Sequence, residues 1–211
     1  MSSMRRVLKK LDRYVSAADV FGIYEDETGI AFLDSSLVNN LGHYSIIGRC
    51  PYLRLVKNGD AFEVNGDSEK DITFEEYMRQ YLVQHMDKSS EDLPIVSGAI
   101  GYVSYDYGMD RMGLDSINED LVSVPEAVMT FYDCFVVEDC LKKETYLVAN
   151  GMTGDAQSNI DVMENEFEKY AWRWDFIDFW ASHMNTEENK STEKEQEKER
   201  MDDSNYSSST K

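Results

Sequence analysis

The sequence has few basic residues for its size. It contains 21 Lys and Arg against 41 Asp and Glu among 211 residues, which gives a formal net charge of -20. Domains that bind nucleic acid gather Lys and Arg on one face, because these cations displace the counterions of the phosphate backbone. No basic stripe offsets the acidic balance here, so we expect no nucleic-acid partner.

Long apolar runs and a cysteine framework are also lacking. No stretch approaches the ~20 apolar residues that cross a bilayer, and polar residues follow the basic N-terminus where a signal peptide would need an apolar run. The three cysteines, Cys50, Cys134 and Cys140, are odd in number and show no CxxC spacing. We therefore expect a cytoplasmic protein with no membrane contact, whose thiols are reduced and structural.

The usual motifs of catalytic and metal sites are absent. The sequence has no phosphate-binding loop, no dinucleotide-binding glycine motif, no HExxH and no GxSxG, and His43, His85 and His183 are scattered. Its carboxylates show no metal-ligand spacing, and a catalytic nucleophile needs an identifiable base beside it. We expect no catalytic residue, no metal ligand and no cofactor in this chain.

The first part of the sequence is rich in strand-like runs. The segment from Arg5 to Tyr14 is compatible with a short helix or an extended strand. The runs at residues 20–24 and 29–33 predict a hairpin, and those at 44–47, 52–56 and 61–64 continue as strands, the last two joined by the turn dipeptide Asn58-Gly59. We expect an antiparallel meander.

A helix is expected next, followed by further strands. Thr73 and Glu76 form a capping box, and apolar residues recur at helical spacing behind them: Phe74, Tyr77, Met78, Tyr81 and Leu82, with His85 at the edge of the stripe rather than in a catalytic role. Strands are predicted at 95–105, 128–138 and 145–149, and a last helix from Asp161 to Ala181. The predicted order is a set of strands, a helix, further strands and a last helix. This order indicates the α+β class with an antiparallel sheet.

Composition changes sharply near the C-terminus. Residues 186–211 are mostly Glu, Lys, Ser, Asn and Asp, without a large aliphatic residue. Such a segment buries too little apolar surface to offset the entropy of ordering. We predict one domain over residues 1–184 and a disordered polar tail over 185–211. The aromatic cluster from Trp172 to Trp180 is expected to close over the sheet or to meet another chain.

Two segments stand out as candidate sites. In the first, an apolar run ends in Leu33-Asp34-Ser35, and Tyr44-Ser45 follows after a short loop. A carboxylate beside a hydroxyl and an aromatic wall can receive an ammonium group, whereas Asp and Ser at this place also commonly cap a turn. The second, GAIGYVSYDYG at residues 98–108, has three glycines that predict close backbone approach or a bend, and its aromatics fit a core or a cleft.

These segments, in this order, resemble a known family. FLDSS, GHYSIIGRCPYLRL, GAIGYVSYDYG and VPEAVMTFYDCFVVED are similar to successive segments of the N-terminal domain of component I of aminodeoxychorismate synthase and anthranilate synthase, over about residues 18 to 150. The SYDYG form resembles the aminodeoxychorismate, or para-aminobenzoate, branch more than the anthranilate branch.

The resemblance implies a non-catalytic domain. In this family the N-terminal domain packs on a C-terminal domain that binds chorismate and Mg²⁺, and a glutamine amidotransferase, component II, supplies ammonia. The resemblance therefore implies a chorismate-binding partner domain in cis or trans, an indirect amidotransferase partner, and Mg²⁺ only in that other domain. On this basis the chain is a truncated product, one half of a split enzyme or a fragment, inactive alone and serving folate biosynthesis.

The resemblance also implies an effector half-site. Family members bind tryptophan between the two domains through a Leu-Leu-Glu-Ser-like motif, which Phe32-Leu33-Asp34-Ser35 matches with Asp in place of Glu. Tyr44 and Ser45 match an adjoining Arg-Tyr-Ser-like segment, in which His43 stands where Arg is usual. Leu33, Asp34, Ser35, Tyr44 and Ser45 are the expected effector-binding residues. The alternatives are a stand-alone sensor of a tryptophan-like amino acid, a fragment of anthranilate synthase component I in tryptophan biosynthesis, and a decayed product without a function.

Overall fold

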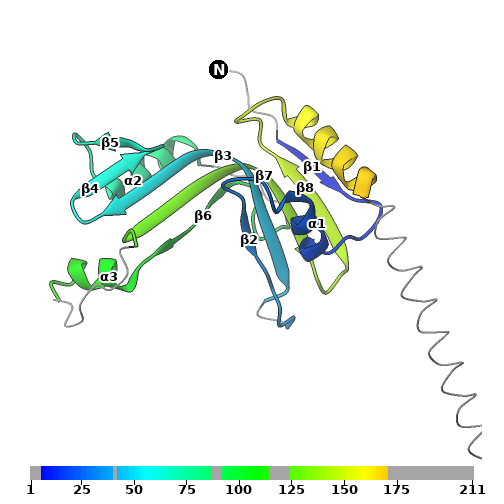
Figure 1. Cartoon of the computed structure of the whole chain (residues 1–211), viewed down its shortest axis with the longest axis horizontal. Helices are drawn as coiled ribbons and strands as arrows, with labels where there is room; N and C mark the ends of the chain where they lie inside the picture. Colours follow the sequence, from blue (N-terminus) through cyan, green and yellow to red (C-terminus); the bar gives the residue numbers. More distant parts are fainter. Residues whose placement is uncertain (1–5, 40–41, 87–91, 115–123, 171–211) are drawn as a thin grey trace, which may run out of the picture. The chain divides into compact units, whose positions relative to one another are not determined.

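The computed structural model describes residues 6–39, 42–86, 92–114 and 124–170 (Figure 1). Its strands are β1 (Val7–Lys10), β2 (Ala31–Leu33), β3 (Tyr44–Asn58), β4 (Ala61–Val64), β5 (Asp67–Glu69), β6 (Gly98–Val103), β7 (Ala127–Asp139) and β8 (Glu144–Ala149). Its helices are α1 (Ala17–Tyr24), α2 (Phe74–Gln84), α3 (Tyr105–Arg111) and a helix over residues 156–170. One antiparallel sheet of eight strands with separate helices confirms the predicted α+β class.

The chain divides into two compact units, Met1–Glu164 and Asn165–Lys211, and the whole sheet lies in the first. The boundary predicted after residue 184, the polar tail and the aromatic cluster at 172–180 all lie outside the described residues. Within the described part of the chain, no helix combines the length and apolar character needed to span a membrane.

Two long strands organise the sheet. β3 and β7 pair antiparallel from Tyr44 opposite Asp139 to Lys57 opposite Ala127, with a bulge between Pro51 and Leu53. The other edge of β3 carries β2 near its start and β4 near its end, and the other edge of β7 carries β6 and β8 in the same tandem way. β1 then adds to β8 and β5 to β4, so both halves of the sheet share the two central strands (Figure 1).

Each half of the sheet has its own apolar core. In one half, α2 covers residues of β3, β4 and β7, whose buried members are Leu53, Leu55, Phe62, Ala127 and Phe131 together with Phe74 of the helix. In the other half, Tyr132, Phe135, Val137 and Val148 form the buried cluster. Alternate residues of these strands point to the opposite face, where Ile47, Val136 and Leu147 are fully buried and α1 contacts β3 and β7.

The hairpin predicted over residues 20–24 and 29–33 is wrong in its first strand. Residues 17–24 form α1, which begins after Ser16, whose side chain accepts a hydrogen bond from the backbone N–H of Asp19 at 3.2 Å. The buried residues Ala17, Val20 and Tyr24 are spaced by three and four positions, which places them on one helical face. The β-branched and aromatic side chains of residues 20–24 favour a strand locally. Burying one face of the helix outweighs that local preference, so the prediction from the sequence was wrong.

The predicted meander is correct only in part. β3, β4 and β5 do follow one another around the sheet, although β5 was not predicted and β3 is one continuous strand rather than two. Of the two alternatives for the N-terminal segment, a short helix or a strand, the structure has the strand. This strand, β1, pairs with β8 rather than with its neighbours in the sequence. The turn predicted at Asn58-Gly59 is confirmed, since Asn58 pairs with Ala61 and Gly59 has a φ of 55°.

The helix predicted after Thr73 is confirmed. The Thr73 side chain accepts from the backbone N–H of Glu76 at 3.3 Å, and Tyr77, Met78 and Tyr81 pack against the core as the stripe requires. Leu82 departs from the stripe, because half of its surface is exposed (50%).

The later strands were predicted near their observed positions, but β6 covers 98–103 rather than the predicted 95–105, and the last helix begins earlier than predicted. Tyr105 does not end a strand: Ser104 accepts a hydrogen bond from the N–H of Tyr107 at 3.1 Å, and α3 begins at Tyr105. The last helix begins at 156 rather than 161, because Asp155 accepts from the N–H of Ser158 at 2.9 Å and so caps it early. Its end, predicted at Ala181, lies outside the described residues.

Gly101 lies where β6 and β7 approach each other closely. A Cβ at this position would lie 2.0 Å from the carbonyl oxygen of Val128 and 2.9 Å from the Cα of Met129. The close backbone approach predicted from the glycines is therefore found here. It does not extend to Gly108, which lies in α3 with nothing within 4 Å of the Cβ it would carry.

We expect Gly101→Ala to lower the free energy of unfolding by about 3 kcal/mol, at the upper end of overpacking effects, because backbone atoms must move apart. Gly108→Ala is the matched control, and it should leave stability unchanged or raise it by up to about 1 kcal/mol, since Ala favours a helix. Urea unfolding of both variants checks this. Equal midpoints for the two variants would contradict the close approach.

Candidate functional site

The predicted effector residues lie on two neighbouring strands. β2 lies beside β3 in the sheet (Figure 1). Leu33 ends β2 and pairs with Ile46 in β3, which places Asp34 and Ser35 beside the start of β3. The connection between the strands turns back at Asn39, whose N–H donates to the carbonyl oxygen of Gly42 at 2.9 Å. The two halves of the motif therefore meet because β2 and β3 are antiparallel neighbours.

Four of the five predicted residues share one hydrogen-bond network. The Ser45 hydroxyl accepts from the backbone N–H of Ser35 at 2.9 Å and donates to Oδ1 of Asp34 at 2.9 Å. The Ser35 hydroxyl in turn donates to the carbonyl oxygen of Tyr44 at 2.7 Å. Leu33 lies next to this network with half of its surface exposed (51%).

The residues of this network differ in solvent exposure, which determines which of them a ligand can reach. Ser45 is buried, with 1% of its surface exposed, whereas Asp34 is exposed and Tyr44 is half-buried. A carboxylate accepts several hydrogen bonds, so Asp34 can hold the Ser45 hydroxyl and still receive an ammonium group from solvent. The same bonds also stabilise the turn after β2, as the turn-capping alternative requires, and both roles are compatible with this geometry.

His43 borders the network. Its Nδ1 is buried and has no hydrogen-bond partner in the part of the chain that the structure describes. Its ring centroid lies 4.3 Å from that of Tyr44. An unsatisfied buried polar atom is costly, so this nitrogen marks a place where a further polar group would be stabilised beside the predicted site.

Asp133 was missed by the sequence reasoning. This fully buried β7 residue accepts hydrogen bonds from the N–H of Met152 at 2.9 Å, from the N–H of Thr153 at 2.7 Å and from the Thr153 hydroxyl at 2.5 Å. The backbone N–H of Asn150 and the side chain of Asn159 donate to it at 3.2 Å. Its oxygens are occupied by these charge-assisted bonds, so it anchors the turn after β8 rather than acting as a base.

A hollow in the described structure lies away from the predicted site. It has a volume of about 950 Å³ and is lined by β4, β5, the start of α2 and Tyr107. Its charges are of both signs, and Lys57 is already paired with Glu126 at 3.1 Å. This mixture of positive and negative side chains does not favour one class of ligand. Among the described residues, no group of three or more His, Cys, Asp and Glu side chains is placed to hold a metal ion.

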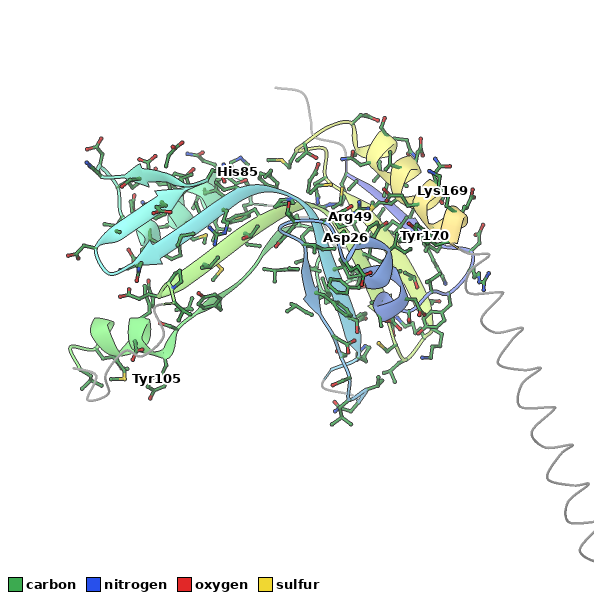
Figure 2. The ribbon with its side chains drawn as sticks, viewed as in Figure 1. Asp26, Arg49, His85, Tyr105, Lys169 and Tyr170 are labelled. Atoms are coloured by element: carbon green, nitrogen blue, oxygen red, sulfur yellow. The ribbon has the colours of Figure 1, made fainter. Side chains whose placement is uncertain are left out.

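His85 lies at the end of α2, as expected for a residue at the edge of the stripe (Figure 2). Its ring stacks on that of Tyr81 with centroids 4.1 Å apart, and its Nδ1 lies 2.9 Å from the Tyr81 carbonyl oxygen. These contacts hold the exposed imidazole against its own helix.

Comparison with known proteins finds a structural relative. No protein-family model matches the sequence, and no curated protein matches it. The crystal structure of anthranilate synthase component I from Streptococcus pneumoniae is similar to this structure, with a TM-score of 0.51 and 18% sequence identity. The match covers 74% of this chain and 35% of that one, so the chain spans about a third of the relative. At this identity the likeness establishes a shared fold.

We expect Ser45→Ala to lower the free energy of unfolding by about 1–3 kcal/mol, because the N–H of Ser35 loses its partner in a half-buried setting. Ser36→Ala, at an exposed neighbouring position, is the control and should change stability by less than about 0.5 kcal/mol. Urea unfolding measures both. If Ser45→Ala behaves like the control, the network does not stabilise the β2–β3 connection.

Proposed function

We propose that this chain is the non-catalytic N-terminal domain of a chorismate-utilising component I enzyme. It acts as a scaffold and as half of an effector site, and it requires a chorismate-binding domain in cis or trans. The observation that carries the proposal is the fold shared with anthranilate synthase component I over 74% of this chain. The four sequence segments that resemble the family's N-terminal domain support it independently.

The β2–β3 connection supports the half-site. Asp34 presents an exposed carboxylate for an ammonium group, and the backbone carbonyl of Tyr44 is held next to it through the Ser35 hydroxyl. The half-buried Tyr44 ring packs against the apolar cluster of β7 and β8. Large apolar side chains are exposed next to them: Leu33 at 51% and Leu37 at 77%. Exposed apolar groups beside polar anchors are typical of a surface that a ligand or another domain covers. We propose that a tryptophan-like amino acid binds here, with the second wall supplied by the catalytic domain.

The branch proposed is aminodeoxychorismate synthesis, which leads to para-aminobenzoate and folate. It rests on the SYDYG segment, in which Ser104 caps α3 and Tyr107 donates to Glu75 at 2.8 Å. In this proposal Mg²⁺ belongs to the catalytic domain, and component II acts through that domain. The fold shared with anthranilate synthase component I makes the tryptophan branch the alternative.

A stand-alone amino-acid sensor is the second candidate. One observation favours it: the network that joins Asp34, Ser35, Tyr44 and Ser45 is complete within this chain. A sensor would bind its ligand with this chain alone, whereas a half-site would not.

We expect the purified chain to turn over no chorismate with ammonium and Mg²⁺. Adding a chorismate-binding domain encoded in the same genome should produce activity, because the acids that hold the metal are supplied by that domain. Release of aminodeoxychorismate or anthranilate identifies the branch. Turnover by the chain alone would refute the non-catalytic assignment.

Calorimetry with tryptophan separates the half-site from the sensor. We expect no binding to the isolated chain and binding to the two-domain assembly, weakened roughly tenfold by Asp34→Asn, since one charge-assisted bond is worth at least about 1.4 kcal/mol. Asp26→Asn, at an exposed position after α1, is the matched control and should bind as the unmodified protein does. Micromolar binding to the isolated chain would favour the sensor.

A further inference from the structure

The chain contains three Asn-Gly dipeptides, which begin at Asn58, Asn65 and Asn150. In such a pair the backbone nitrogen of the glycine can attack the side-chain amide of the asparagine before it. Glycine favours this reaction because it has no side chain to hinder the approach of its nitrogen. The three dipeptides are chemically equal, so their surroundings in the fold decide which of them reacts.

Asn58 lies at the tip of the hairpin between β3 and β4. It pairs with Ala61, so Gly59 and Asp60 are the two turn residues, and Gly59 has a φ of 55° at the first turn position, where mirror-image hairpin turns favour glycine. Asn58 is exposed, and no hydrogen bond holds its side chain within the described part of the chain. Its amide can therefore turn toward the nitrogen of Gly59.

Asn65 is also exposed at a hairpin tip, but its side chain is held. Its Oδ1 accepts a hydrogen bond from the backbone N–H of Arg54 at 2.7 Å, and its Nδ2 donates to the carbonyl oxygen of Tyr52 at 3.4 Å. Both bonds tie the amide to the neighbouring strand β3. They must break before the amide carbon can meet the nitrogen of Gly66.

Asn150 is held more firmly still. Only 9% of its surface is exposed. Its Oδ1 accepts from Nε of Arg6 at 2.8 Å, and its Nδ2 donates to the carbonyl oxygens of Val96 at 3.0 Å and Asp133 at 2.9 Å. Reaction at Asn150 would require the loss of these three bonds, so among the three asparagines only Asn58 has an amide that the fold leaves ready to react.

A carboxylate lies at the nitrogen that would attack Asn58. Oε1 of Glu126 accepts a hydrogen bond from the N–H of Gly59 at 3.1 Å, and its Oε2 lies 3.1 Å from Nζ of Lys57. Glu126 is 67 positions away in the sequence, so the fold brings it here from the segment before β7. A base must lie within hydrogen-bond reach of the proton that it removes, and Glu126 meets this condition.

We propose that Asn58 is a site of intramolecular deamidation, in which Gly59 supplies the attacking nitrogen and Glu126 receives its proton. The nitrogen of Gly59 bonds to Cγ of Asn58 while its proton passes to Glu126. The bond from Cγ to Nδ2 then breaks, and the amide nitrogen takes up that proton and leaves as ammonia. Water opens the cyclic imide at either of its two carbonyl carbons, which gives aspartate or isoaspartate at position 58.

Both products change the tip of the hairpin. Each adds a negative charge beside Glu126 and Asp60, and isoaspartate also inserts its Cβ carbon into the backbone where β3 turns into β4. The site is independent of the proposed effector half-site, whose residues lie at the start of β3. A failure of the deamidation chemistry therefore leaves the proposed function untouched, and the reverse also holds.

The test incubates the full-length chain at neutral pH and follows the three sites by mass spectrometry, with fragmentation that locates the changed residue and separates isoaspartate from aspartate. We expect Asn58 to deamidate at least about tenfold faster than Asn65 or Asn150, whose hydrogen bonds must first break. The same chain unfolded in urea is the control, and there the three sites should react at similar rates. Equal rates in the folded chain, or a faster reaction at Asn65 or Asn150, would overturn the proposal.

Glu126→Gln tests the base separately. Gln keeps an oxygen that accepts the N–H of Gly59 but cannot take up its proton, so we expect deamidation of Asn58 to slow by at least about tenfold. Without a base in the protein, the rate should follow hydroxide and rise about tenfold per pH unit, more steeply than in the unmodified chain. Glu63→Gln, at an exposed position in β4, is the matched control and should change neither readout. An unchanged rate and pH profile in Glu126→Gln would overturn the role of Glu126.

Discussion

The antiparallel pairing of β3 with β7 is the constraint on which the rest of the structure depends. These strands run through both halves of the sheet, and β2, β4, β6 and β8 each add to one of them. Each half buries its own apolar cluster against residues of this pair. Close packing fixes their register: a Cβ on Gly48 of β3 would lie 2.8 Å from the Tyr132 ring of β7. A one-residue slip would reverse the buried face of both strands.

The proposed effector half-site follows from that register. The start of β3 brings Ser45 beside Asp34 after β2. This site is exposed at an edge of the sheet, where we propose that another domain completes it. Part of anthranilate synthase component I shares this fold.

The sequence predicted where helices and strands form better than it predicted which strands pair with each other. The α+β class, the Asn58-Gly59 turn and the capped helix after Thr73 follow from local rules that hold whatever the tertiary context. The strand predicted at residues 20–24 failed because Ala17, Val20 and Tyr24 are buried as a helical face. The pairing of β1 with β8 joins residues far apart in the sequence. The candidate site was found because its two segments are separated only by one short loop.

The central proposal is that this chain provides one part of a larger chorismate-utilising assembly. Sedimentation of the purified chain with a chorismate-binding domain encoded in the same genome tests it most directly. The account predicts a one-to-one complex that forms with the isolated parts and is stabilised further by tryptophan. Two species that sediment independently at every concentration, with and without tryptophan, would contradict it.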